Sequence, residues 1–312
     1  MIETFSDIRY LERHEIDIAK WDRAIASSAN GLIYARSFYL DSMAENWSAL
    51  IAGDYEFLMP LTWNKKFGFS YLYQPYFTKS LGVFGNNSQS FEISSFLNAI
   101  PKKFKYWDID VNENNFVSIA NKKNKLTQYT RTNYVLSLQE DYEQLRLQYK
   151  RLANRMKRKA IDNHLRIVKG EDPAVIVKLY ARDYKKQHRS ITDSVYDRLV
   201  RCTSIAIEKN LAATYLATTG SGETLAYYMI LKDEQFVYSL IGGSNFAGKK
   251  VGAFYLLTDA IIHDHAGTNK IFRFEGSDIP GISFFDALFG PQKISYQHLV
   301  MNNLPFPLRF FK

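Results

Sequence analysis

Glycine and lysine residues between positions 242 and 252 could bind phosphate. The segment reads GGSNFAGKKVG, follows the apolar run Phe236–Ile241 and precedes another apolar run that begins at Ala253. Glycine lets the backbone approach a ligand, and the start of a helix adds free N–H groups and partial positive charge. We predict a strand, a phosphate-binding turn and a helix from Ala253 to about His265. The predicted phosphate-binding residues are Ser244, Asn245, Gly248, Lys249, Lys250 and Gly252. The alternative is an ordinary strand-to-helix connection.

The carboxylate of Glu275 could take part in proton transfer. Glu275 ends a predicted strand that begins at Lys270, and Gly276 follows it. A carboxylate there could accept a proton from an attacking amine if its pKa suits that task. The alternative is that Glu275 pairs with Arg273 or with backbone N–H groups. We predict Glu275 as a general base.

A run of basic residues between Arg146 and Lys159 contains no acid. Apolar residues recur within it at helical spacing, which predicts one long helix from Asp141 to about His164. Guanidinium groups match phosphate in geometry, so we predict that Arg155 and Arg158 bind an anionic substrate. The net charge of +8 also suits an anionic partner. The alternative is a solvated helix face.

The elements that would position these residues occur twice along the chain. Residues 35–111 and 192–275 each read as a helix, a three-stranded meander, a glycine-containing loop, a helix and a strand. This order predicts an α/β (α+β) fold with two tandem domains, 1–140 and 141–312. The loop at 82–88 has no lysine or arginine. We therefore expect the phosphate site in the second domain and a degenerate first domain.

The stretch 236–290 resembles the GNAT (Gcn5-related N-acetyltransferase) superfamily, and more specifically its Fem-type branch. The Fem-type likeness is carried by Phe272-Arg273-Phe274-Glu275-Gly276-Ser277, Gly281 and Phe289-Gly290. The resemblance implies two GNAT-like domains with mixed, mostly antiparallel sheets. It also implies a tyrosine that protonates a leaving thiolate. The segment after the last predicted strand has Phe284 and Phe285 instead, so the candidates are Tyr228, Tyr238 and Tyr255.

The function that this resemblance implies is acyl transfer. We expect an N-acyltransferase that moves an acyl or aminoacyl group from a CoA-type donor to an amine acceptor. Acyl-CoA would be a co-substrate, with no tightly bound cofactor. In the Fem-type alternative, the donor is aminoacyl-tRNA and the acceptor is a peptidoglycan (cell-wall) precursor. A third alternative is a non-catalytic protein that binds a nucleotide-like ligand. Tyr238 is our candidate proton donor, and Tyr228 is placed with Arg155 and Arg158 at the substrate.

Several classes of function lack support in the sequence. No apolar run is long enough for a transmembrane helix, and the N-terminus lacks the basic start and apolar core of a signal peptide. The single cysteine, Cys202, allows no disulfide within the chain. These features favour the cytoplasm. No set of histidine, cysteine or acidic residues has zinc spacing, and we expect neither a metal nor a DNA partner.

Overall fold

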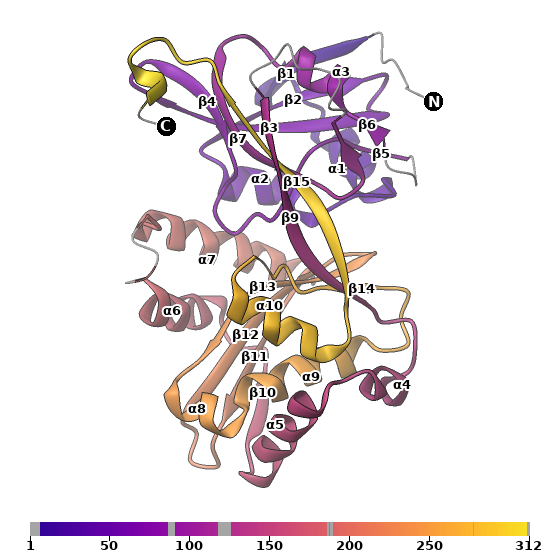
Figure 1. The fold of residues 1–312 in the computed structure, drawn as a ribbon, viewed down its shortest axis with the longest axis vertical. Helices are drawn as coiled ribbons and strands as arrows, with labels where there is room; N and C mark the ends of the chain where they lie inside the picture. Colours follow the sequence, from indigo (N-terminus) through magenta and orange to yellow (C-terminus); the bar gives the residue numbers. More distant parts are fainter. Residues whose placement is uncertain are drawn as a thin grey trace. The chain divides into compact units, whose positions relative to one another are not determined.

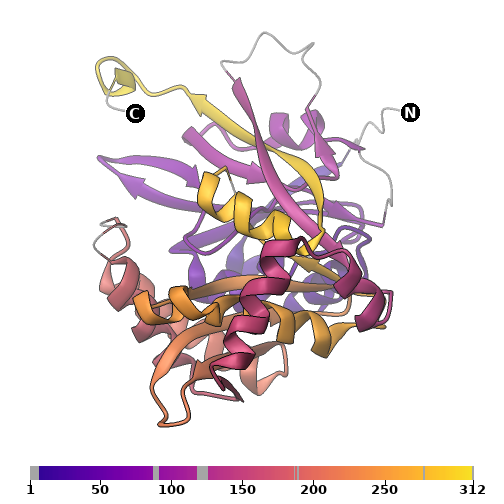
Figure 2. The same ribbon diagram turned by 60° about the horizontal axis from the view of Figure 1, so that its bottom comes forward.

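The computed structural model describes residues 7–86, 91–117, 126–185, 187, 190–276 and 278–310. The predicted α/β class with mixed, mostly antiparallel sheets is confirmed (Figures 1 and 2). The chain forms two compact units, one of residues 1–131 with 295–312 and the other of residues 132–294. It leaves the first unit within β9 (Leu126–Ser137) and returns within β15 (Gln292–Asn302). The domains 1–140 and 141–312 stay a prediction. Residues 295–312 make their contacts mainly with the first unit and are therefore grouped with it.

The first unit is built on a sheet in the order β1-β2-β3-β4-β7-β15. Its other main strands are β1 (Ile8–Glu12), β2 (Asn46–Ala52), β3 (Phe57–Lys66), β4 (Phe69–Tyr73) and β7 (Phe104–Val111). Neighbouring strands are antiparallel except for β4 and β7, which are parallel. Its short strands are β5 (Phe84–Gly85), β6 (Phe91–Glu92) and β8 (Asn115–Phe116). Its α-helices are α1 (Ile18–Ser27), α2 (Ser37–Met43) and α3 (Ser94–Ala99).

Short-range signals in the sequence explain the first helix of this unit. The Asp17 side chain accepts a hydrogen bond from the Lys20 backbone N–H and so caps α1. Trp21 and Ile25, four residues apart, are the buried residues of α1. On the sheet, Leu50 and Ala52 pack in the same core as Phe96 and other apolar residues of the unit.

The second unit has a sheet in the order β9-β14-β13-β12-β11-β10. Its strands after β9 are β10 (Arg166–Lys169), β11 (Ala212–Thr218), β12 (Thr224–Lys232), β13 (Phe236–Ser244) and β14 (Ile271–Arg273). Only β13 and β14 are a parallel pair. Its α-helices are α4 (Tyr142–Leu147), α5 (Arg151–Asp162), α6 (Pro173–Tyr184), α7 (Asp193–Glu208), α8 (Phe246–Val251), α9 (Ala253–His265) and α10 (Pro280–Asp286).

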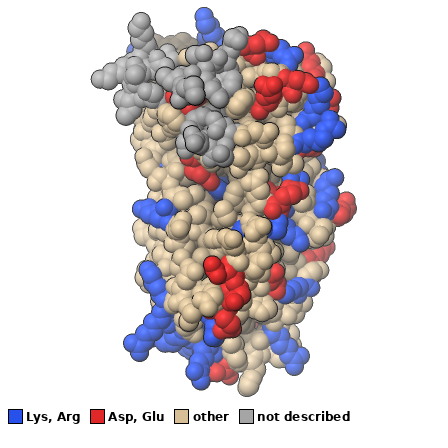
Figure 3. All heavy atoms as spheres, turned by 90° about the vertical axis from the view of Figure 1, so that its right-hand side faces the viewer, with Lys and Arg blue, Asp and Glu red and all other residues tan. Residues whose placement is uncertain are grey.

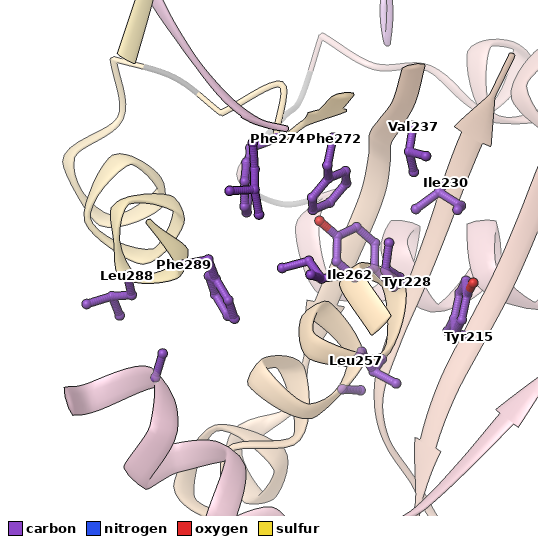
Figure 4. Close-up of a cluster of buried hydrophobic side chains, with 14 of the residues drawn as sticks. Tyr215, Tyr228, Ile230, Val237, Leu257, Ile262, Phe272, Phe274, Leu288 and Phe289 are labelled. Atoms are coloured by element: carbon purple, nitrogen blue, oxygen red, sulfur yellow. The ribbon is translucent and has the colours of Figure 1, made fainter. Parts of the chain in front are cut away.

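Helices cover both faces of this sheet. Successive residues of a strand point to opposite faces. On β12, the Tyr227 hydroxyl donates to Asp183 Oδ2 of α6 at 3.0 Å, whereas Tyr228 lies in the core with Leu257 of α9. Figure 4 shows this core, with Tyr228, Ile230 and Val237 of the sheet beside Leu257 and Ile262 of α9. The strongly apolar sequence of α9 is thus explained by its central position.

The predicted long helix from Asp141 to about His164 is wrong in one respect, because it is two helices. α4 ends at Leu147 and α5 begins at Arg151. Lys150 between them is extended, and its N–H donates to the carbonyl of Leu288 at 2.8 Å. The Tyr149 ring packs edge-on against Phe289, with centroids 5.1 Å apart. A distant part of the chain therefore breaks a helix that the local pattern favours.

The predicted repeat in the order of elements is present. The first unit has α2, the meander β2-β3-β4, a loop, α3 and β7. The second has α7, the meander β11-β12-β13, α8 with α9, and β14. In both units the last strand lies parallel to the third strand of the meander.

Candidate active site

A cavity of about 680 Å³ lies in the second unit, where β13 and β14 separate. The two strands pair over Phe236–Tyr238 and Ile271–Arg273. Beyond Arg273 the chain turns away toward α10, while β13 continues to Ser244. Residues 239–244 line one wall of the cavity, and residues 274–276 with parts of α10 line another. Residues from helices on both faces of the sheet line the cavity, since Tyr184 of α6 and Phe254 of α9 belong to its lining.

A β-bulge in β13 faces this cavity. Ser239 pairs with Ile230 and Ile241 pairs with Met229, so Leu240 is left out of the register with β12. Leu240 is one of the residues that line the cavity. Bulges redirect backbone and side-chain groups, and they are common beside active sites.

The predicted glycine turn is wrong at its start, because Gly242 and Gly243 belong to β13. They pair with Tyr228 and Tyr227 of β12. A Cβ at Gly242 would lie 2.7 Å from the Phe254 ring, and one at Gly243 would lie 2.7 Å from the Tyr227 hydroxyl. These glycines therefore make room for aromatic side chains. The turn comes later, as the short helix α8 followed by Gly252 at φ 81°.

Four of the six predicted phosphate-binding residues line the cavity: Ser244, Gly248, Lys249 and Gly252. Asn245 instead caps α8 by accepting the Gly248 N–H at 2.7 Å. The Lys250 Nζ lies 4.3 Å from the centroid of the Phe246 ring. A Cβ at Gly248 would lie 2.2 Å from the Leu225 carbonyl oxygen, so this glycine also allows close packing. Lys249 is thus the predicted cation that lies at the cavity.

Glu275 lines the cavity and is held by two neighbours. Arg273 Nε donates to its Oε1 at 3.0 Å, and Asn133 Nδ2 donates to its Oε2 at 3.0 Å. The Glu275 side chain is 7% exposed, and its backbone is left-handed at φ 49°. A left-handed non-glycine residue is strained by roughly 1–3 kcal/mol and is often found at functional sites. The pairing with Arg273 is the alternative that the sequence offered for this residue, and the general-base role stays a prediction.

The sequence analysis missed Asp286, a second carboxylate that lines the cavity. It is 4% exposed and approaches Gly276 so closely that a Cβ there would lie 1.5 Å from its Oδ2. Burial, together with the charge of Asp286, raises the pKa of Tyr228 above its usual value. One sequence signal could have identified Asp286, because it is the only acid in the apolar run 282–289.

Tyrosines occupy several sides of the cavity. Tyr228 stacks on Phe254 with centroids 4.7 Å apart, and its hydroxyl donates to Ser239 Oγ at 2.8 Å. Tyr255 lines the cavity, as do Tyr180 and Tyr184, which the sequence analysis missed although they lie four residues apart on one helix. Tyr238 lies elsewhere: it is fully buried, and its hydroxyl donates to Asp233 Oδ2 at 2.5 Å.

The basic run divides into a buried lysine and exposed residues. Lys157 Nζ lies 3.1 Å from Asp259 Oδ1 of α9, and both side chains are largely buried. Arg155 and Arg158 are exposed on α5. Burial raises the pKa of Tyr255, which lines the cavity. The positive charge of Arg155 opposes that rise, so Arg155 has an electrostatic effect on a residue of the cavity wall. Figure 3 shows blue Lys and Arg side chains gathered at the lower end of the face in view.

Two negative findings concern the part of the chain that the structure describes. Its His, Cys, Asp and Glu side chains form no group of three or more that could hold a metal ion. None of its helices combines the length and the apolar character needed to cross a membrane.

Comparison with solved structures identifies the fold. FemX matches with a TM-score of 0.66 at 12% identity, over 97% of this chain and 99% of FemX. A conserved protein of unknown function from Bacteroides thetaiotaomicron VPI-5482 matches with a TM-score of 0.58 at 11% identity, over 95% and 100% of the two chains. The C-terminal domain of a putative lysylphosphatidylglycerol synthetase from Agrobacterium fabrum matches with a TM-score of 0.52 at 9% identity, over 92% and 91%.

No protein-family model matches the sequence, and the comparison with curated proteins gave no match. The identities to the solved structures are low, so these likenesses establish the fold. The chain shares the fold of FemX, in agreement with the Fem-type resemblance of the sequence.

Proposed function

We propose that this protein transfers an acyl or aminoacyl group from an activated carrier to an amine, in the cavity of the second unit. The observation that carries the proposal is the separation of β13 from β14, which gives one cavity with walls on both faces of the sheet. Two substrates can then approach the same point from opposite sides. The fold shared with FemX supports the same class of reaction.

The chemistry follows from the groups that line the cavity. The amine nitrogen attacks the carbonyl carbon of the donor, a C–N bond forms, and the bond from that carbon to the carrier breaks. Backbone N–H groups at the Leu240 bulge polarise the carbonyl oxygen. Glu275 takes the proton that the amine loses, with Asp286 as the neighbouring carboxylate. Holding both substrates in one cavity supplies much of the rate enhancement.

The leaving group of the carrier needs a proton. Tyr255 and Tyr228 line the cavity and are the candidates for this step. Tyr228 already donates to Ser239, so its proton is oriented away from a ligand. We therefore assign the role to Tyr255, and Tyr238 is set aside because its hydroxyl is bound to Asp233.

The donor that we propose first is an acyl-CoA. Its phosphates would lie near Lys249 of α8 and the start of α9. Thermal denaturation in the presence of CoA, acetyl-CoA and longer acyl-CoAs tests this, because a ligand that binds the folded state raises the unfolding midpoint. A midpoint that no CoA species raises would remove the CoA donor. Stabilisation without any product in an acyl-transfer assay would indicate a non-catalytic ligand-binding protein.

Two neighbouring lysines make a matched pair of variants for this test. Lys249→Ala should raise the dissociation constant of the CoA donor about tenfold, since a charge-assisted contact to phosphate is lost. Lys250→Ala should leave the constant within about twofold, because Lys250 lies over Phe246. Equal effects of the two substitutions would contradict the placement of the phosphates.

Aminoacyl-tRNA is the second candidate donor, and the exposed arginines of α5 favour it. Arg155 lies near the cavity wall, and Arg158 is one turn further along the helix. If tRNA is the donor, binding should weaken steeply with salt, and Arg155→Ala with Arg158→Ala should reduce that dependence. The acceptor would then be an amine such as that of a cell-wall precursor, which UDP-linked muropeptides can probe in the same thermal assay.

A further inference from the structure

The first unit carries an exposed surface that combines phenylalanines with basic residues. We name it the tip surface and define it as Lys65, Lys66, Phe67, Phe306, Arg309 and Phe310. A cavity of about 390 Å³ lies beneath it, lined from the β3–β4 hairpin by Lys66 and Phe67 and from the C-terminal segment by Leu304 and Leu308. The two segments are therefore neighbours, and Figures 1 and 2 show the C-terminal turn beside the end of that hairpin. The proposed transfer reaction uses none of these residues.

The phenylalanines of the tip surface are unusually exposed. Phe67 is 77% exposed, Phe306 is 75% exposed and Phe310 is 67% exposed. Single exposed apolar residues are common on proteins, but here Phe67 lines an apolar cavity, and Phe306 and Phe310 belong to the C-terminal segment that supplies Leu304 and Leu308 to the same cavity, which indicates a binding surface. The Phe306 and Phe310 rings pack on each other with centroids 5.9 Å apart, which keeps both at the surface.

The backbone at Phe67 gives a second, independent observation. Phe67 and Gly68 form the two-residue loop between the paired residues Lys66 and Phe69, with φ of 51° and 80°. Such a turn favours asparagine, aspartate or glycine at its first position, and a bulky side chain there is strained. The turn itself therefore does not explain a phenylalanine at this tip. A strained residue that also presents its ring to solvent indicates a role in binding.

The charges of the tip surface are positive. Lys66 Nζ lies 5.5 Å from the centroid of the Phe67 ring, and Arg309 Cζ lies 5.1 Å from that of Phe310. Lys65, Lys66 and Arg309 are exposed, and within the described residues no carboxylate forms an ion pair with them. Two acids interact with the cavity lining: Asp108 accepts a hydrogen bond from Tyr106, and the charge of Glu45 acts on Tyr71. The occupant should therefore be apolar and anionic.

We propose that the tip surface binds the surface of an anionic phospholipid bilayer. Phe67, Phe306 and Phe310 enter the boundary between headgroups and acyl chains, while Lys65, Lys66 and Arg309 contact lipid phosphates. Aromatic side chains beside basic ones suit that boundary, which is apolar on one side and negatively charged on the other. A second copy of this chain fits less well, because a symmetric contact would set these cations against the same cations.

Co-sedimentation with lipid vesicles tests the proposal on the full chain. The probes are vesicles of phosphatidylcholine alone and vesicles that also contain phosphatidylglycerol. We expect binding to the anionic vesicles, weakened by salt, and about tenfold less binding to the neutral ones. Phe67→Asn should lower the partition coefficient about tenfold, because one ring no longer leaves water. It should not lower the unfolding midpoint, since asparagine suits this turn.

Phe246→Ala is the matched control. Phe246 is 74% exposed and also lies beneath a lysine, but it belongs to α8 of the second unit. Its substitution should leave vesicle binding unchanged. Equal binding by Phe67→Asn and the unaltered protein, or equal binding to neutral and anionic vesicles, would overturn the proposal. Self-association that Phe67→Asn abolishes, with no vesicle binding, would assign the surface to a second copy instead.

Discussion

The two units follow the same order of elements, yet only one of them opens between its parallel strands. In the second unit, β13 and β14 part after three paired residues and leave a cavity of about 680 Å³. In the first unit, β4 and β7 pair in the same parallel sense, but the space beside the end of β4 is only about 10 Å³. The difference lies in where the chain goes after the third strand of each meander.

The segment that follows β4 fills the place where a cavity would open. The Leu81 N–H donates to the Asp110 carbonyl at 2.9 Å, and the Asn112 N–H donates back to the Leu81 carbonyl at 2.9 Å. The Gln74 side chain accepts from the Asp110 N–H at 3.1 Å. These bonds extend the pairing of β7 to a loop. In the second unit the chain instead turns into α8 and α9, and the edge of β13 remains available.

The same arrangement of strands can therefore give a closed sheet or a cavity that residues from both faces of the sheet line. A few hydrogen bonds between the loop after β4 and the strand β7 accompany the closed form. The tip surface lies at a different place in the first unit.

The largest expected effect tests whether catalysis takes place in the second unit, whose parallel strands separate. Glu275→Gln should lower kcat about a hundredfold or more, since the general base that we propose is removed. Asp110→Asn, which changes the acid near the end of the equivalent strand in the first unit, should leave kcat within about twofold. Rates are measured with the donor and amine selected in the thermal assay, after circular dichroism confirms that each variant is folded. A larger loss in Asp110→Asn than in Glu275→Gln would reverse the assignment of the two units.

The next effect concerns the wall of the open cavity. α5, which supplies Met156 to that wall, is joined to α9 by the buried pair of Lys157 and Asp259. Lys157→Met should lower the free energy of unfolding by about 3 kcal/mol, because Asp259 is left buried without its cation. Lys159→Met on the exposed side of the helix is the control and should change it by less than about 0.5 kcal/mol. Urea denaturation measures the free energy of unfolding of both variants. Similar losses in the two would mean that Lys157 contributes no more to stability than a lysine exposed to solvent.

Local patterns predicted the elements well wherever local physics decides them. The strands between Ala212 and Ser244 alternate or are uniformly apolar, and α9 is apolar enough to be central. The strand before Glu275 was also predictable, although β14 ends at Arg273, two residues before the predicted end. Lys249 could be placed near the cavity for a similar reason, since it precedes the predicted helix that is now α9.

What could not be predicted depends on residues far apart in the sequence. The break between α4 and α5 is set by a bond from Lys150 to Leu288. Gly242 pairs with Tyr228 as part of β13, and its missing side chain leaves room for the ring of Phe254. Asp286 reaches the cavity only because it packs against Gly276. The first unit was anticipated as degenerate because its loop at 82–88 has no basic residue; residues 87 and 88 lie outside the described residues, and in the described part hydrogen bonds join the segment to β7.

A smaller effect tests that closure directly. Asn115 is 3% exposed, and its Oδ1 accepts the Val83 N–H at 2.6 Å while its Nδ2 donates to the Val83 carbonyl at 3.0 Å. Asn115→Ala should cost about 2 kcal/mol of unfolding free energy, because a buried N–H loses its partner. Hydrogen exchange should become faster at 81–85 and stay unchanged at 239–244. Unchanged exchange at 81–85 would mean that other bonds hold the loop closed.

The smallest expected effect is a pH dependence that belongs to the second unit. Burial lowers the pKa of His265, at the end of α9, below its ordinary value near 6.5. The unfolded chain therefore takes up a proton that the folded chain resists, so stability falls as the pH drops through about 6.5. The loss stops growing once the pH is below the lowered pKa. His265→Gln removes this titration, and its urea midpoint should fall less between about pH 7 and about pH 5.

His14→Gln in the first unit is the matched control for this prediction, since His14 is exposed. It should keep the pH dependence of the unaltered protein. If both substitutions flatten the profile equally, the titration cannot be assigned to the packing of α9. If only His265→Gln does so, acid weakens first the helix that lines the open cavity, and the closed unit should keep its slow hydrogen exchange at the pH where α9 begins to lose it.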